Sequence, residues 1–221
     1  MTDRHILFAM PIYDMVEPKT MLEVARLVRR EDTTFMPVMG SPIDVVRNGI
    51  VKMFLENPDY THLFMLDSDV VPGEGVLDYM LACDWPMAAG VVPICCQNAI
   101  VTNIVIKVVD GKEARFMTGW SKEQEPFIVE AAGTGCVLYR REVFETIPWP
   151  WYRWVEEAEG RVGEDIFFSR KAAGYGYTYK VHPQALCDHY KKFPMLEIVR
   201  AFEGRKPLAD DTGKVETGST L

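Results

Sequence analysis

The sequence predicts an α/β fold with a mixed central sheet flanked by helices. Short apolar runs alternate with segments of helical periodicity between residues 6 and 93. That alternation predicts parallel strands with helices on both faces of the sheet. After Pro93 shorter strands are joined by turns, which predicts that the second half adds antiparallel strands. The chain has 221 residues, a length that suits a single domain.

The first three elements alternate between strand and helix. The run HILFAMPIYD, residues 5–14, predicts a strand that Pro11 stops. In residues 18–32, PKTMLEVARLVRRED, the apolar positions recur at helical spacing and predict an amphipathic helix. The run TTFMPVMG, residues 33–40, predicts the second strand.

The next elements complete the first half. Residues 41–57, SPIDVVRNGIVKMFLEN, predict a helix with Ser41 as N-cap and Pro42 at the first helical position. The run THLFML predicts a third strand, and a short helix follows near Gly75–Ala82. The run WPMAAGVVPI, residues 85–94, predicts the fourth strand.

In the second half of the chain the sequence predicts strands and helices that are shorter than those of the first half. Residues 99–118 form a hairpin with its turn at Asp110–Gly111, and residues 126–147 form a strand, a glycine turn, a strand and a short helix. A helix follows Gly163 and ends at Gly174, before another strand. Residues 193–204 predict a last helix, so a single domain spans 1–204 and a flexible tail spans 205–221.

The composition narrows the function classes. Acidic residues outnumber basic ones by 32 to 24, and the net charge of −8 argues against a nucleic-acid partner. The five cysteines form no C-x-x-C pair, so we expect reduced thiols and a cytoplasmic location. No apolar run approaches the roughly 18–20 residues that a membrane span needs.

Two aspartates follow the third predicted strand, in FMLDSDVVP. On an extended segment Asp67 and Asp69 would point to the same side, at the carboxyl edge of the sheet where α/β proteins bind ligands. Their charges repel unless a cation lies between them or one takes up a proton, and Mg²⁺ or Mn²⁺ could fill that place. A solvated turn would also explain the pair.

The second half carries two further candidates. Glu164 and Asp165 open a predicted helix, and His189 follows the last predicted strand. The two carboxylates could merely complement the helix dipole, and a lone histidine is often structural. Near a helix N-terminus and a metal we expect the anionic form of Asp165 to be favoured.

The order of these motifs resembles the metal-dependent glycosyltransferases of the GT-A fold, especially the family-2-like group. The resemblance covers residues 6–192 and is carried by MPIYD, VVRNGIV, FMLDSDVVP, AAGTGCVLYRREVFE, GEDIFFSRKAAGYGYTYKVHP and DHY. It implies the GT-A (nucleotide-diphospho-sugar transferase) fold and transfer of a sugar, of the hexosyltransferase type, to an acceptor hydroxyl.

The resemblance also implies roles for individual residues. Asp69, Asp67 and His189 would form the site for Mn²⁺ or Mg²⁺, and Asp165 would be the general base of an inverting reaction. The nucleotide-sugar donor would contact Pro11, Tyr13, Asp14, Arg47, Asp67, Ser68 and Lys191. The acceptor or the transferred sugar would contact Gly133, Thr134, Gly135, Trp154 and Glu164.

Aromatic residues cluster in PWPWYRW, residues 148–154, which predicts either core or a partly exposed sugar platform, and we favour a loop near the site. A UDP-sugar is favoured over a GDP-sugar, although the second strand ends in MPVMG without the acidic residue that many family-2 members place there. Two alternatives are a sugar nucleotidyltransferase and an inactive nucleotide-sugar-binding module. The acceptor is unknown.

Overall fold

A computed structural model describes residues 4–96, 99–109, 113–116, 123, 125–158 and 160–191. The chain divides into a first unit, residues 1–190, and a second unit, residues 191–221. The fold described below is that of the first unit. The helix predicted at residues 193–204 and the tail predicted at 205–221 lie outside the described residues.

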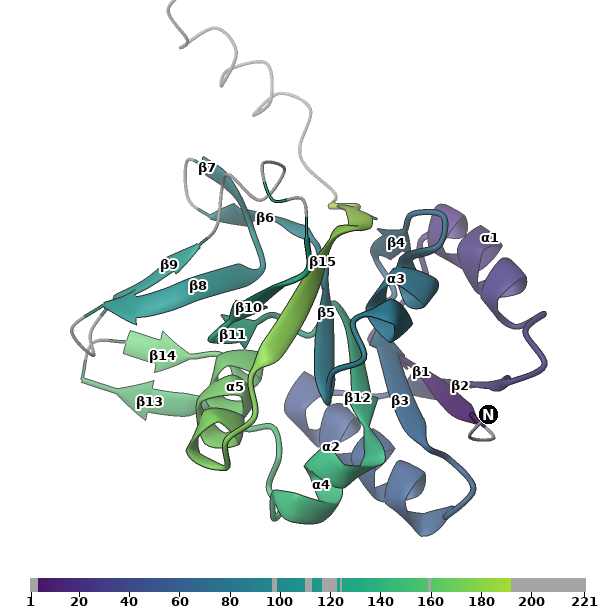
Figure 1. The fold of residues 1–221 in the computed structure, drawn as a ribbon, viewed down its shortest axis with the longest axis horizontal. Helices are drawn as coiled ribbons and strands as arrows, with labels where there is room; N and C mark the ends of the chain where they lie inside the picture. Colours follow the sequence, from purple (N-terminus) through teal and green to yellow (C-terminus); the bar gives the residue numbers. More distant parts are fainter. Residues whose placement is uncertain are drawn as a thin grey trace, which may run out of the picture. The chain divides into compact units, whose positions relative to one another are not determined.

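The first half follows the predicted alternation of strands and helices (Figure 1). Its elements are β1 (Ile6–Ile12), α1 (Pro18–Leu27), β2 (Thr33–Met39), α2 (Ile43–Glu56), β3 (His62–Leu66), β4 (Val70–Pro72), α3 (Val76–Ala82) and β5 (Met87–Val91). The prediction for the start of α2 is wrong by one position. Pro42 is the N-cap with extended backbone, and no side chain caps the helix, so Ser41 does not hold that place.

The second half contains β6 (Pro93–Cys96), β7 (Ala99–Thr102), β8 (Ile104–Val109), β9 (Glu113–Phe116), β10 (Phe127–Val129), β11 (Ala131–Ala132), β12 (Cys136–Arg140), α4 (Arg141–Thr146), β13 (Val155–Glu157), β14 (Gly160–Val162), α5 (Glu164–Gly174) and β15 (Tyr179–His189). The predicted hairpin is confirmed for β8 and β9, which pair antiparallel, whereas β7, the first part of its predicted first arm, pairs with β6 instead. Its predicted turn at Asp110–Gly111 lies outside the described residues.

The main sheet is mixed, as the sequence predicts. Its strand order is β10-β15-β5-β12-β3-β1-β2, with β4 attached to β15. The pairs β1–β2, β1–β3 and β5–β15 are parallel, whereas β12 runs antiparallel between β3 and β5. The carboxyl ends of β1, β3 and β5 therefore meet the amino end of β12 at one edge of the sheet, the upper edge in Figure 1.

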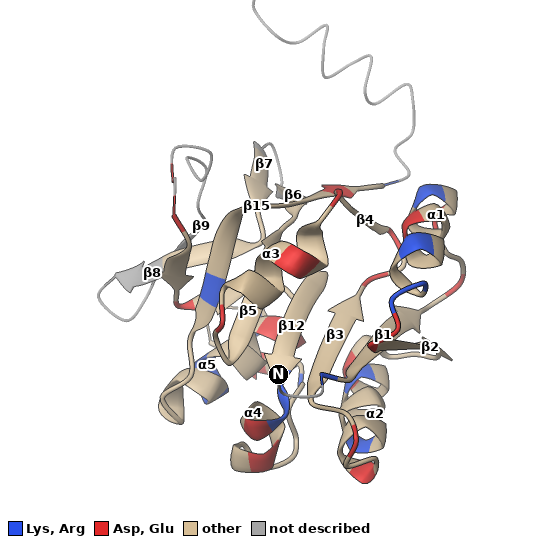
Figure 2. Cartoon of the chain, turned by 45° about the vertical axis from the view of Figure 1, so that its right-hand side comes forward, with Lys and Arg blue, Asp and Glu red and all other residues tan. Residues whose placement is uncertain are grey.

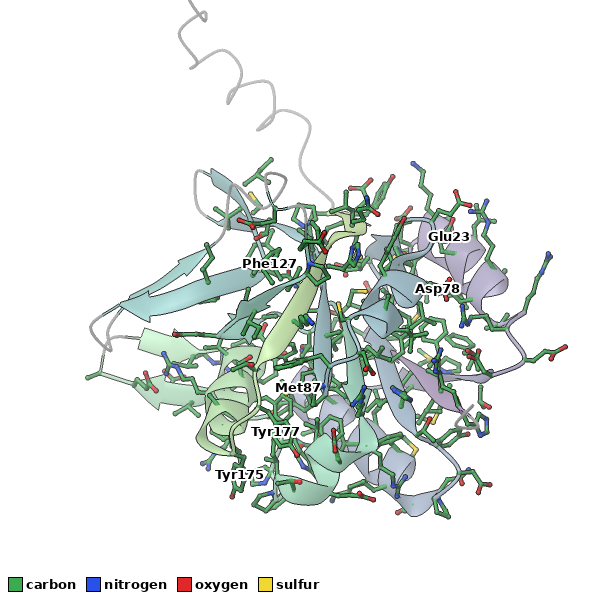
Figure 3. All side chains as sticks on the ribbon, in the orientation of Figure 1. Glu23, Asp78, Met87, Phe127, Tyr175 and Tyr177 are labelled. Atoms are coloured by element: carbon green, nitrogen blue, oxygen red, sulfur yellow. The ribbon has the colours of Figure 1, made fainter. Side chains whose placement is uncertain are left out.

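Two apolar layers hold the sheet between the helices. Successive strand residues point to opposite faces, so Ile6, Phe8 and Met10 pack in a cluster with residues of α1 and α3. Leu7 and Ala9 pack in the other cluster, with residues of α2, α4 and α5. Figure 3 draws the side chains as sticks and labels Met87 of β5, which belongs to this second cluster. Among the helices that the structure describes, none is both long enough and apolar enough to cross a membrane.

A glycine in β5 makes room for two thiols. Gly90 is buried, and a Cβ atom built there would lie 3.0 Å from Cys136 Sγ and 3.2 Å from Cys187 Sγ. Both cysteines are themselves buried, on β12 and β15, so the sulfur atoms have little space to withdraw. The packing of three strands near the carboxyl edge thus depends on the missing side chain.

We expect Gly90→Ala to lower the free energy of unfolding by about 1–3 kcal/mol, the usual cost of overpacking a core. The control is Gly49→Ala in α2, where an added Cβ meets no atom within 4 Å and alanine favours the helix by up to about 1 kcal/mol. Urea unfolding of both variants measures the difference. A Gly90→Ala protein as stable as the parent would contradict the packing argument.

Candidate active site

A cavity of about 650 Å³ opens at the carboxyl edge of the sheet. Nine of the residues predicted for a site line it: Arg47, Asp67, Gly133, Thr134, Gly135, Trp154, Glu164, Asp165 and His189. They come from distant parts of the sequence, which the sheet topology brings together. The helix α2 supplies Arg47, the turn after β3 supplies Asp67, and the first turn of α5 supplies Glu164 and Asp165.

The backbone at the paired aspartates differs from our expectation. We assumed an extended segment, but β3 ends at Leu66 and the N–H of Val70 donates to the carbonyl oxygen of Asp67 at 3.1 Å, which closes a turn. The two carboxylates contact different partners. Asp67 accepts hydrogen bonds from Arg47, whereas Asp69 Oδ2 lies 3.3 Å from His189 Nε2. The argument from i and i+2 on one strand face was therefore wrong.

Arg47 is the buried cation of the site, with only 4% of its surface exposed. Its Nη2 donates to Asp67 Oδ1 at 2.7 Å and Oδ2 at 2.9 Å, and its Nη1 donates to Glu164 Oε1. Burial alone would lower the pKa of Arg47. The two carboxylates raise this pKa by more than burial lowers it, so the net shift is upward. Arg47 thus joins α2, the β3 turn and α5 through charge-assisted hydrogen bonds.

Asp165 lies between two glycines. Its Oδ1 accepts the N–H of Ile166 at 2.7 Å. A Cβ atom on Gly163 would lie 2.7 Å from Oδ1, and one on Gly133 would lie 3.2 Å from Oδ2. Larger residues at these two positions would meet the carboxylate, so the glycines leave the space that it occupies.

Burial raises the pKa of Asp165 above its ordinary value, and the opposing effect of Arg47 does not compensate. We expected a metal and the helix N-terminus together to favour the anion; in the protein alone desolvation outweighs the favourable contacts, and the effect of a metal stays a prediction. The pKa of Glu164 is raised for the same first cause. A carboxylate with a raised pKa binds a proton more tightly and is a stronger base.

His189 and Asp69 form a donor pair that fits a divalent cation. The Nδ1 atom of His189 lies 2.7 Å from the carbonyl oxygen of Pro93, which can only accept, so Nδ1 carries the proton. In the neutral ring the lone pair of Nε2 then faces the Asp69 carboxylate, and the two repel unless a proton or a metal ion is shared between them. A backbone carbonyl that orients a metal-binding histidine in this way is common at metal sites.

The donor set is small. Among the described residues, no group of three or more histidine, cysteine, aspartate or glutamate side chains is arranged to hold a metal ion. An ion held by Asp69 and His189 would need further oxygen ligands from water or from a substrate. Mg²⁺ and Mn²⁺ suit this arrangement, because such sites often use few protein ligands together with phosphate oxygens.

Sequence reasoning missed Asn103, which fixes the loop of Gly133. Its Nδ2 donates to the carbonyl oxygens of Gly90 and Gly133, both at 3.1 Å, and its Oδ1 accepts the N–H of Val92 at 2.8 Å. Asn103 is buried and lines the cavity. An amide within the apolar run VTNIVI was the available signal, since a buried polar side chain needs such partners.

The aromatic run serves two purposes. Trp151 and Tyr152 are buried in the core cluster with α2 and α5, whereas Trp149 is 61% exposed. Trp154 lines the cavity, and the guanidinium of Arg161 lies 4.2 Å from its ring centroid. The run is therefore partly core and partly a loop beside the site.

Six of the predicted site residues do not line the cavity: Pro11, Tyr13, Asp14, Ser68, Asp69 and Lys191. Pro11 is buried in β1, and Tyr13, just beyond that strand, is 74% exposed. Lys191 belongs to the second unit of the chain. The roles assigned to these residues stay predictions.

Comparison with known proteins identifies the fold. No family model and no curated protein matches the sequence. The crystal structure of A197 from STIV matches with a TM-score of 0.60 and 20% identity, over 85% of this chain and 86% of that one. The crystal structure of GalNAc-T7 with UDP, GalNAc and Mn²⁺ matches with a TM-score of 0.54 and 11% identity, over 90% of this chain. The fold is GT-A.

These likenesses bear on the fold and not on the activity. The match to GalNAc-T7 covers only 48% of that longer chain, so this protein spans about half of it. At identities of 20% and 11%, the fold class predicted from the sequence is confirmed, and the roles of single residues rest on the geometry of this chain.

We expect Arg47→Met to lower the free energy of unfolding by about 3–5 kcal/mol, because it removes the partner of the buried Glu164 and of the partly buried Asp67. Arg26→Met is the control, since Arg26 forms an exposed pair with Glu23 and such pairs contribute about 1 kcal/mol or less.

Urea unfolding followed by circular dichroism measures both variants. Adding Glu164→Gln to Arg47→Met should recover part of the loss, because it removes one of the two uncompensated charges. Equal, small effects of Arg47→Met and Arg26→Met would show that the buried ion pairs are not structurally important.

Proposed function

We propose that this protein is a metal-dependent glycosyltransferase that moves a sugar from a nucleotide-diphosphate sugar to an acceptor hydroxyl, with inversion at the anomeric carbon. The observation that carries the proposal is the gathering of Asp69, His189 and Asp165 at one edge of a GT-A sheet, beside a cavity of about 650 Å³. This edge is where α/β sheets bind ligands.

The charge of the cavity supports a requirement for a cation. Its lining contains the carboxylates of Asp67, Glu164 and Asp165, and the guanidinium of Arg47 is already paired with two of them. A donor diphosphate would enter an acidic site and be repelled. A bound Mn²⁺ or Mg²⁺ supplies the positive charge that stabilises the leaving diphosphate. Asp69 and His189 would hold it.

Asp165 is suited to accept the proton of the acceptor hydroxyl. Its carboxylate lines the cavity, the N–H of Ile166 fixes Oδ1, and burial makes the group more basic. Gly133 leaves space beside Oδ2. Trp154 lines the same cavity, where its ring offers an apolar face of the kind on which sugars stack.

We propose a uridine diphosphate sugar as the donor. The GalNAc-T7 structure contains UDP, GalNAc and Mn²⁺ on the same fold, which makes uridine the first base to test. Pro11, Tyr13 and Asp14 follow or end β1 at the carboxyl edge, next to the strand that leads to Asp67, and would receive the base.

Binding of UDP should depend on Mn²⁺, and Asp69→Ala and His189→Ala should each weaken it by at least about tenfold, since each removes one ligand of the cation. Isothermal titration calorimetry with and without EDTA measures this. Asp59→Ala, an exposed carboxylate in the loop before β3, is the control. UDP binding that persists in EDTA and in both variants would contradict the metal site.

Asp165→Asn should reduce sugar transfer by about 10²-fold or more while UDP affinity stays within a few-fold, because the amide keeps the shape but cannot take a proton. Release of UDP from UDP-sugars, with water as acceptor, gives the rate, and NMR gives the anomeric configuration of the product.

The variant should also keep its melting temperature or gain some, because it removes a charge that burial disfavours. A rate near that of the parent, or a product with retained configuration, would remove Asp165 from the base role and leave the metal site unaffected.

A further inference from the structure

A second cavity, of about 390 Å³, lies at the opposite ends of β3 and β12 from the candidate active site. The residues that begin β3 and end β12 line it, among them His62 and Arg140. Arg4 enters from the segment before β1, and Trp85 enters from the loop after α3. Figure 2 shows blue ribbon at the start of α4, the helix that directly follows Arg140.

This cavity is positive although the chain has a net charge of −8. Burial lowers the pKa of His62 to about 4, the positive charges of Arg4 and Arg140 add to that effect, and the negative charge of Asp32 opposes it. The two arginines that line the cavity favour an anion over a cation beside the ring. Among the described residues that line the cavity, Asp84 is the single acid.

Asp84 does not close the cavity to an anion. Its side chain is 87% exposed, and it pairs with Arg140 at the protein surface. Exposed ion pairs are weak, so a bound anion could replace this carboxylate on Arg140.

Apart from Thr61, the remainder of the cavity wall is apolar. Leu81, Leu138 and Trp85 line it, and the indole N–H of Trp85 donates to the carbonyl oxygen of Thr178 at 2.9 Å, which fixes the ring. A site with two cationic groups and an aromatic wall suits a ligand that has an anionic group and a ring.

We propose that this cavity binds a small organic phosphate, with the phosphate between Arg4 and Arg140 and an apolar ring against Trp85 and Leu138. The proposal is independent of the glycosyltransferase assignment, because no residue is shared between the two cavities.

His62 provides the readout. The hydroxyl of Thr61 donates to the carbonyl oxygen of His5 at 3.1 Å, so Nδ1 of His62, 2.9 Å from that hydroxyl oxygen, is the donor to it. The Nε2 atom then takes the proton on titration. An anion bound beside the ring stabilises the imidazolium and raises the pKa of His62.

The experiment follows the four histidines by NMR during pH titrations with phenyl phosphate, inorganic phosphate or sodium chloride at equal ionic strength. EDTA is present throughout to keep metal from the other cavity, and His62→Gln assigns the signal. We expect phenyl phosphate to raise the pKa of His62 by about one unit, the usual effect of a nearby opposite charge, and to bind at least tenfold more tightly than inorganic phosphate.

The double variant Arg4→Gln/Arg140→Gln should abolish the ligand-dependent shift, measured against its own ligand-free titration. Arg170→Gln, which removes another exposed arginine paired with a glutamate, should leave the shift intact. No shift beyond that in sodium chloride would overturn the proposal. So would a shift that survives the double variant, or equal affinity for phenyl phosphate and inorganic phosphate.

Discussion

The candidate active site depends on one buried cation. Arg47 comes from α2, Asp67 follows β3 and Glu164 opens α5, and the guanidinium is the group that all three elements share. A carboxylate that is buried without such a partner is strongly destabilised, so the buried Glu164 depends on Arg47 more than the partly exposed Asp67 does. The ion pairs also set the orientation of Asp67, which contacts Arg47 and not the histidine that Asp69 approaches.

The reversed strand β12 gives the site its second wall. Because β12 runs antiparallel between β3 and β5, its amino end meets their carboxyl ends, and the loop of Gly133–Gly135 lies beside Asp67. The N–H of Asp67 donates to the carbonyl oxygen of Gly135 at 2.9 Å. Asn103 holds the other end of the loop through Gly133. A wholly parallel sheet would have placed this loop at the far edge.

Periodicity predicted most of the fold, because alternate burial along β1 and the apolar face of α2 are local properties of the sequence. Periodicity did not predict which residues gather at the site; the order of the motifs along the sequence did. The directions of the side chains could not be predicted from the sequence. Asp67 and Asp69 point to different partners because a turn replaces the extended backbone that we expected. The prediction of Ser41 as the N-cap of α2 was wrong for a similar reason. Pro42 has an extended backbone, so the helix begins after it and Pro42 is the N-cap.

The charges of the site suggest why its buried carboxylates are retained although their burial lowers the stability of the fold. Asp165 and Glu164 both have raised pKa values because burial disfavours their charged forms, and Arg47 offsets only part of that cost. A fold selected for stability alone would replace such groups with apolar ones of similar size. A cation bound by Asp69 and His189 would lower the cost of these charges, so the acidity that disfavours an empty site favours an occupied one. If the proposed cation binds, stability and binding are coupled through the same carboxylates.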